Sequence, residues 1–235
     1  METSVPSSVP PSGGVPAPFA PSPARSLPLA LALFAAPWGF VVANGAYAWA
    51  TRAGGGDGTG AEALALAAAH PGLYRLGTVA AMLGSLLMVP AVLGVRRLLA
   101  GRSPKLGFLG AVLTAGGYIC YFGVALSGIT EVAMAEHGGP LQDYAIVLDN
   151  SQSDASTLWV FLLFVLGNLV GTLLLGLALL RSRAVPTWAA AAVLAWPPLH
   201  VTGLVVGSEW FEVAGALLQA AGLVVTGLRL LASPR

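Results

Sequence analysis

Six apolar segments, each long enough to cross a lipid bilayer, constrain the fold of this sequence more than any other feature. They run over residues 27–50, 73–95, 106–128, 157–180, 186–207 and 210–231. An α-helix rises about 1.5 Å per residue, so about 20 apolar residues span a hydrocarbon core about 30 Å thick. Because lipid offers the backbone no hydrogen-bond partners, such segments fold as helices. The sequence therefore predicts an all-α protein, a polytopic transmembrane bundle of six antiparallel helices within residues 27–231.

The overall composition agrees with a membrane protein. The chain is 56% hydrophobic and only 9% charged, whereas a soluble domain carries about 25% charged residues. With a net charge of +1 and no long basic run, we expect no nucleic-acid partner. The expected partners are the lipid bilayer and either another membrane protein or a second copy of the chain. The single Cys120 excludes an intramolecular disulfide and a metal site built from cysteines, and we expect no cofactor.

The basic residues indicate how the helices are oriented in the membrane. Nine of the 11 basic residues fall on one side of the predicted membrane, at Arg25, Arg96, Arg97, Arg102, Lys105, Arg181, Arg183, Arg229 and Arg235. Nine of the ten acidic residues fall on the other side. The positive-inside rule makes the basic side cytoplasmic, so we expect both termini in the cytoplasm. Lysine has AT-rich codons, and the chain has a single lysine against ten arginines. This ratio indicates a GC-rich bacterial genome, and we therefore expect the protein in the plasma (inner) membrane.

The segments outside the predicted helices are short. Residues 1–26 are rich in proline and serine, which predicts a disordered cytoplasmic tail, and residues 232–235 form a second tail. A cleaved signal peptide is the alternative interpretation of the first apolar segment, although that segment is longer than the usual 7–15 residues. Thr59 and Glu62 match a helix-capping box, which predicts a short helix up to His70, and a second short helix is expected near 141–149.

Polar and small residues recur at helical spacing on two of the predicted helices. On the last helix they are Glu212, Gly215, Gln219, Gly222, Thr226 and Arg229. On the third they are Gly107, Gly110, Thr114, Gly117, Tyr121, Gly128 and Glu131. Steps of three and four residues place each set on one face, and polar groups facing lipid are costly. Both faces should therefore point into the bundle, either for close packing or as a polar pocket.

His200 is the one histidine inside a predicted span, and it follows Pro197 and Pro198. An ionisable residue inside the membrane is a functional candidate, and the alternative is a neutral imidazole that donates to a carbonyl freed by the prolines. Together with Glu131 and Glu212, His200 could form a cluster on the outer side. Glu209, Glu136, His137 and His70 are further candidates for this cluster. His and carboxylate groups suit a divalent cation, but the sequence has no metal-binding spacing, so we assign no metal ligand and no catalytic residue.

Two asparagines complete the candidate polar pocket, which comprises His200, Glu131, Glu212, Gln219, Tyr121, Asn168 and Asn44. Asn168 lies near the middle of its span, between Gly167 and Gly171. For Asn168 and Asn44, hydrogen bonding between helices is the expected use. The pair Gly203 and Gly207 is interpreted in the same way, as a packing motif.

The segment His70–Arg75, HPGLYR, enters the second span, and Arg96-Arg97 ends it. With these features, its size and its alternating long and short loops, the chain resembles the small six-helix bacterial membrane proteins of the domain-of-unknown-function type. The resemblance implies the six-helix fold but no activity. The leading functional hypothesis is a small carrier, or an accessory or assembly factor of a membrane or envelope process. The alternatives are an intramembrane enzyme or metal-binding protein using the outer His/Glu cluster, and a purely structural partner.

Overall fold

A computed structural model describes residues 26–233, and within this range the chain is helical without strands. Six helical spans are long and apolar enough to cross a membrane, which is typical of a multi-pass membrane protein. They are α1 (Leu27–Thr51), α3 (Pro71–Leu99), α4 (Pro104–His137), the continuous span α6–η2–α7 (Ala155–Ser182), α8 (Thr187–Val206) and α9 (Trp210–Ala232). The predicted tail over residues 1–26 lies outside the described residues except for Ser26.

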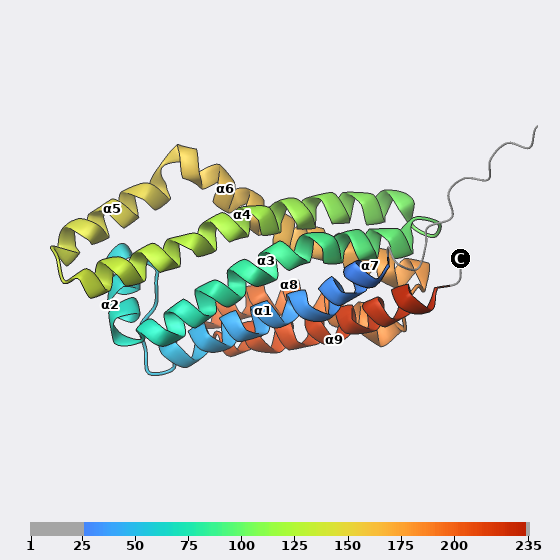
Figure 1. Ribbon diagram of the computed structural model, residues 1–235, viewed down its shortest axis with the longest axis horizontal. Coiled ribbons are helices and arrows are strands. Elements are labelled where there is room, and N and C mark those ends of the chain that lie inside the picture. Colours follow the sequence, from blue (N-terminus) through green and yellow to red (C-terminus); the bar gives the residue numbers. More distant parts are fainter. Residues whose placement is uncertain (1–25, 234–235) are drawn as a thin grey trace, which may run out of the picture.

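The six spans form a bundle of antiparallel helices that is elongated along their common direction (Figure 1). Each helix packs on the next in a closed order: α1 on α3, α3 on α4, α4 on the α6–α7 span, α7 on α8, α8 on α9, and α9 back on α1. The first apolar segment, α1, is therefore an integral part of the bundle. Segments distant in sequence meet at the α1–α9 contact, which joins the first span to the last.

The two ends of the bundle carry opposite charge. At the end where Leu27 and Ala232 lie, the described charged residues are all basic, namely Arg96, Arg97, Arg102, Lys105, Arg181, Arg183 and Arg229. We call this the arginine end. The other end holds all nine acidic residues of the described range, together with Arg52 and Arg75, and we call it the carboxylate end.

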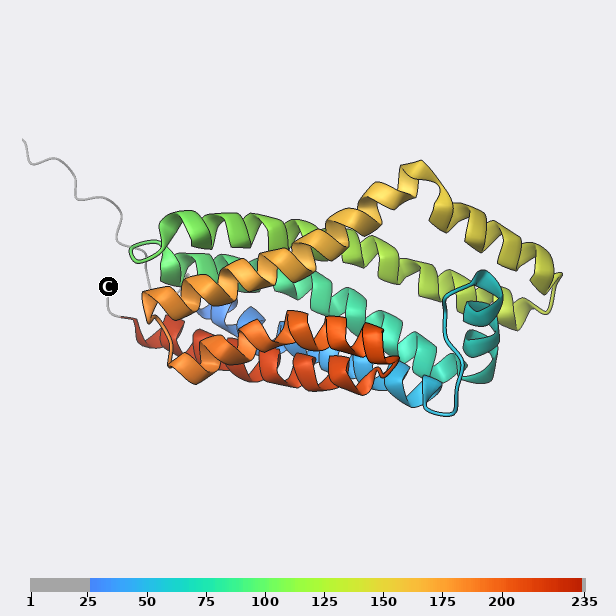
Figure 2. The ribbon, with the colours of Figure 1, turned by 180° about the vertical axis from the view of Figure 1, so that it is seen from behind.

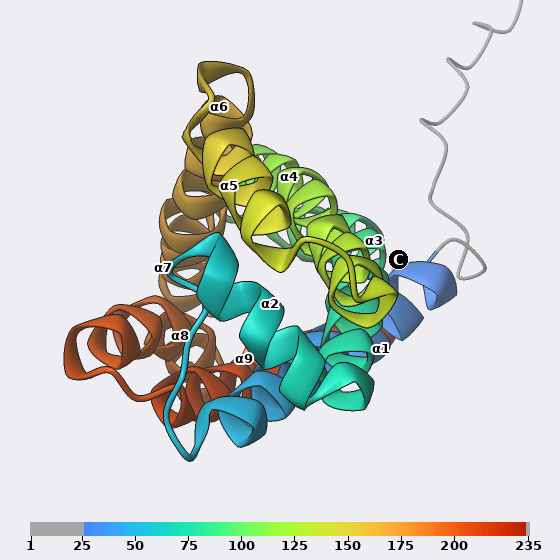
Figure 3. The ribbon, with the colours of Figure 1, turned by 90° about the vertical axis from the view of Figure 1, so that its left-hand side faces the viewer.

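Two short helices cover the carboxylate end. Helix α2 (Gly60–Ala69) lies across it, as the end-on view in Figure 3 shows, and packs against α4 and α5 (Leu141–Ser153). The Thr59 side chain accepts a hydrogen bond from the Glu62 amide at 3.2 Å, as the capping box predicts. Asp149 on α5 accepts a second one from the Gly60 amide at 2.6 Å. Helix α4 continues to His137, nine residues beyond the predicted span, because this outer part packs on α2.

The polar and small residues predicted to lie on one face of each of two helices are buried or half-buried in the bundle, except for Arg229, which is exposed. On α9, Gly215, Gln219, Gly222 and Thr226 are buried, and on α4 the same holds for Gly107, Gly110, Thr114, Gly117, Gly128 and Glu131. The glycines allow close approach of neighbouring helices: a Cβ at Gly222 would lie 2.5 Å from the Ala189 carbonyl oxygen on α8. Close packing is therefore one use of both sets of residues.

The span Ala155–Ser182 is packed tightly in one half only. Its arginine-end half, α7 (Thr172–Ser182), buries five of its 11 residues against α4 and α8. Its carboxylate-end half, α6 (Ala155–Leu166), buries none of its 12 residues. Helix α6 packs on α4 and α5 but, within the described chain, forms no packing interface with α8. The helices thus diverge toward the carboxylate end, as Figure 2 shows from behind.

Candidate functional site

His200 and Glu212 form a close pair near the carboxylate end. His200 Nδ1 lies 3.0 Å from a Glu212 carboxylate oxygen, and the two side chains are 21% and 13% exposed. The approach is close, but the ring N–H is not aligned with the oxygen as in a hydrogen bond. The His200 ring stacks on Trp196, with centroids 4.9 Å apart and planes inclined by 14°. The helical step from Trp196 to His200 on α8 creates this stacked pair, which fixes the imidazole beside α9.

Glu209 joins this pair from the turn between α8 and α9. The pKa of Glu209 is raised to about 7, mainly by burial and also by the nearby carboxylates of Glu212 and Asp57, while His200 opposes this rise. Asp57 in turn accepts a hydrogen bond from the Tyr47 hydroxyl at 2.7 Å. Glu209 and Asp57 are therefore within electrostatic range of the His200–Glu212 pair, and carboxylates outnumber cationic groups in this region.

The raised pKa of Glu209 predicts a pH-dependent stability. A carboxyl group whose pKa is higher in the folded chain than the ordinary 4.5 binds protons more tightly when folded, so its protonation stabilises the fold at low pH. This stabilisation is lost as the pH rises from about 4.5 to about 7. We expect the midpoint of thermal unfolding in detergent to fall over this interval, and to fall less in Glu209→Gln. An identical pH profile for both proteins would contradict this role of Glu209.

Glu131 has a different partner from His200 and Glu212. It is 5% exposed on α4 and accepts a hydrogen bond from the Tyr74 hydroxyl of α3 at 2.5 Å. Glu136, one turn further along α4, pairs with Arg75. The predicted cluster of His200, Glu131 and Glu212 is therefore only partly assembled. Within residues 26–233 no three His, Cys, Asp or Glu side chains come together so that they could hold a metal ion.

An aromatic layer lies between the polar groups of the carboxylate end and the packed half of the bundle. Tyr121 of α4 stacks on Phe164 of α6, with centroids 4.4 Å apart. Tyr118, which is fully buried, packs against Phe40 of α1 at 4.8 Å. Tyr121, one of the candidate pocket residues, is half-buried and connects α4 with the loosely packed α6 through this stacking.

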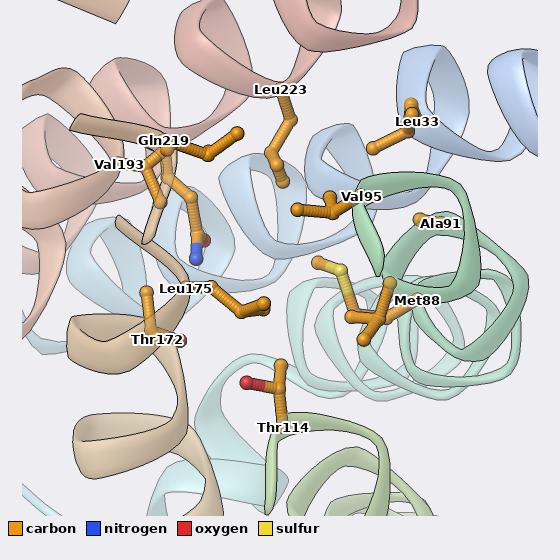
Figure 4. A pocket seen from close by; sticks show the side chains of 12 residues that line it. Leu33, Met88, Ala91, Val95, Thr114, Thr172, Leu175, Val193, Gln219 and Leu223 are labelled. Atoms are coloured by element: carbon orange, nitrogen blue, oxygen red, sulfur yellow. The ribbon is translucent and has the colours of Figure 1, made fainter. Parts of the chain in front are cut away.

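A small internal cavity lies just beyond the aromatic layer. Its volume of about 10 Å³ is roughly that needed by one water molecule. Gln219 of α9, Thr114 of α4 and Thr172 of α7 reach it from three different elements, among apolar side chains such as Met88 and Leu223 (Figure 4). Gln219 was predicted as a pocket residue. Thr172 was not, because Thr172 belongs to neither of the two sets of polar and small residues that the sequence analysis found.

A π-helical segment, η2 (Gly167–Gly171), interrupts the fourth span next to this cavity. π-helical turns in α-helices often mark functional sites. Asn168 is buried in this segment, but its Oδ1 accepts no hydrogen bond from the described residues. The buried hydroxyl groups of Thr114 and Thr172 also have no hydrogen-bond partner among these residues. The hydrogen bond between helices expected for Asn168 is therefore not found for its carbonyl oxygen.

Two further sequence expectations concern α1 and α8. Asn44 is half-buried, one helical turn from Phe40 and toward the carboxylate end. Gly203 packs close to the turn at Ser208, but a Cβ at Gly207 would meet no atom within 4 Å, and Gly207 ends α8 with a φ of 68°. Gly207 is therefore a helix C-cap, and the interpretation of Gly203 and Gly207 as a packing pair is wrong.

Three polar partners in the site carry no signal in the sequence, because they act from other segments. They are Tyr74, Tyr47 and Asp57, of which Tyr74 is separated from Glu131 by 57 residues. The site and fold define the class of the protein as a multi-pass helical membrane protein with polar groups at several depths. Comparison with protein-family models, with curated proteins and with solved structures finds no match for the chain.

Proposed function

We propose that this protein is a small membrane carrier that accepts a cationic or protonatable solute at its carboxylate end. The observation that carries the proposal is the contrast within one span: α7 buries five residues, whereas α6 buries none. A carrier that alternates between two sides is closed on one side and open on the other in any one state. The packing of α7 on α8 and the divergence of α6 from α8 fit such a state.

The polar groups lie at depths that suit a path through the bundle. Asp57, Glu209 and the His200–Glu212 pair lie at the carboxylate end, and their excess of negative charge favours a cation. Tyr121 stands at the aromatic layer, and the cavity with Gln219 follows. The cavity has a volume of only about 10 Å³, so passage of a solute requires α7 to move relative to α4 or α8.

The charge distribution supports an orientation for this carrier. Seven basic residues of the described chain lie at the arginine end, and the positive-inside rule assigns such an end to the cytoplasm. The carboxylate end then faces outward, with both chain termini in the cytoplasm of a bacterial cell and the protein in its plasma membrane.

The transport hypothesis is tested with methylammonium as the probe cation. The purified full chain is reconstituted into liposomes, and the uptake of radiolabelled methylammonium is compared with that of protein-free liposomes. We expect the protein to accelerate uptake, and Glu212→Gln or His200→Asn to lower the initial rate about tenfold, because each change removes one partner of an intramembrane pair. The matched control is Asp143→Asn, an exposed carboxylate at the same end, which should transport like the unmodified protein.

Two results would overturn the proposal. One is uptake no faster than that of protein-free liposomes, with both methylammonium and, using a trapped pH-sensitive dye, protons as probes. The other is a Glu212→Gln protein that transports both probes at the unmodified rate.

A further inference from the structure

Three arginines from three separate elements line a single depression at the arginine end. Arg102 comes from the turn between α3 and α4, Arg183 from the turn between α7 and α8, and Arg229 from the last turn of α9. The depression has a volume of about 390 Å³, which is enough for a phosphate group with a short attached chain. We call it the arginine pocket.

The charge of the arginine pocket is not neutralised by the described chain. Within residues 26–233, the ion pair Arg75–Glu136 and the His200–Glu212 contact both lie at the carboxylate end. All nine acidic residues of this range also lie at that end. Three like charges that converge without a counter-charge repel one another, and an anion between them relieves this repulsion.

The backbone around the pocket also favours an anion. Arg183 is the one residue other than glycine with positive φ, at 49°, in the described chain. This left-handed residue is the C-cap of α7, where the chain leaves the helix and turns toward α8. Pro186, which also lines the pocket, precedes the first turn of the 20-residue α8. The free amides and the positive dipole end of a helix start attract phosphate.

The remaining lining is apolar, with Leu98, Val185 and Ala232 beside the three guanidinium groups. Guanidinium forks bind phosphate oxygens in a bidentate manner, while apolar side chains suit the hydrocarbon part of an amphiphile. We propose that the arginine pocket binds a phosphate-bearing anion, either the headgroup of an anionic phospholipid or a free phosphate ester. This site is independent of the proposed transport path, which lies at the opposite end.

Binding is tested on the purified full chain in an uncharged detergent, by native mass spectrometry and by ligand-induced shifts of the thermal unfolding midpoint. The probes are phosphatidylglycerol, zwitterionic phosphatidylcholine and millimolar glycerol 3-phosphate. We expect phosphatidylglycerol to bind at least about tenfold more tightly than phosphatidylcholine. Binding of glycerol 3-phosphate alone would assign the pocket to a free phosphate ester, and binding of phosphatidylglycerol alone would assign it to a lipid headgroup.

Two sets of variants test whether anion binding depends on the arginine pocket itself or only on the general positive charge of the arginine end. The test variant is Arg102→Gln/Arg183→Gln/Arg229→Gln, and the control Arg97→Gln/Lys105→Gln/Arg181→Gln removes equal charge from the same end outside the pocket. We expect the test variant to lose anion binding about tenfold or more, and the control less than about threefold.

A second variant covers the case in which the triple substitution prevents folding. Arg183→Gly removes one guanidinium and keeps the left-handed backbone favourable, so it should fold and bind the anion several-fold more weakly. The proposal is overturned if the two triple variants lose affinity equally, if phosphatidylcholine binds as well as phosphatidylglycerol, or if none of the probes binds.

Discussion

Replacing Gly167 by alanine is expected to lower the free energy of unfolding by about 3 kcal/mol, the upper part of the usual cost of overpacking a core. Gly167 lies in η2, directly against α4. A Cβ at this position would stand 2.3 Å from the Leu113 carbonyl oxygen and 2.5 Å from the Gly117 Cα. Both contacts are with backbone atoms, which cannot turn aside as a side chain can. The two spans would have to separate, and the measurement is unfolding by sodium dodecyl sulfate in mixed micelles.

The matched control for Gly167→Ala is Gly116→Ala. A Cβ at Gly116 would meet no atom within 4 Å, and alanine is favoured over glycine inside a helix by about 1 kcal/mol. We therefore expect Gly116→Ala to keep or slightly raise the stability. Equal stabilities of the two variants would show that the close contact between η2 and α4 does not hold these spans together.

Tyr74→Phe is expected to destabilise the protein by about 2 kcal/mol, because it leaves the buried Glu131 carboxylate without its phenol donor. The comparison is Tyr47→Phe, which removes a similar hydrogen bond to Asp57. Because Asp57 is exposed, water replaces the lost donor, and we expect a cost below about 0.5 kcal/mol. Both changes are measured by the same mixed-micelle unfolding.

A double-substitution cycle checks the physical cause of the Tyr74 effect. In a Glu131→Gln background, Tyr74→Phe should cost less than about 1 kcal/mol, because no charged oxygen is then left unpaired. An additive double variant would mean that Tyr74 stabilises the bundle by packing alone.

The sequence predicts best those features that depend on helix geometry. The spacing of Gly215, Gln219, Gly222 and Thr226 fixes one face of a helix whatever the tertiary structure, and this face is buried. The six apolar helical spans follow equally directly from segment length. The end of α4 was underestimated because hydropathy marks where a helix leaves lipid, and α4 continues past that level through its packing on α2.

Features that depend on the fit between distant segments could not be predicted from one sequence. The π-helical turn at Gly167 accompanies the close approach of Gly117, 50 residues earlier in the chain. The Tyr74 partner of Glu131 likewise depends on the packing of α3 on α4. His200 and Glu212 are close in sequence and lie on consecutive helices, so their pairing could be predicted from the sequence. That Glu131 pairs with Tyr74 instead could not be predicted in this way.

The length of α4 has a consequence for the mechanics of the protein. Its 34 residues extend about 51 Å at about 1.5 Å per residue, which is about 20 Å more than the thickness of a hydrocarbon core of about 30 Å, so α4 projects beyond the lipid. This projecting rod carries α2 and α5 and is braced by the exposed Arg75–Glu136 pair. Because dissolved salt screens exposed charges, the stiffness of the rod should respond to the ionic strength of the surrounding medium, while the part embedded in lipid is shielded from it.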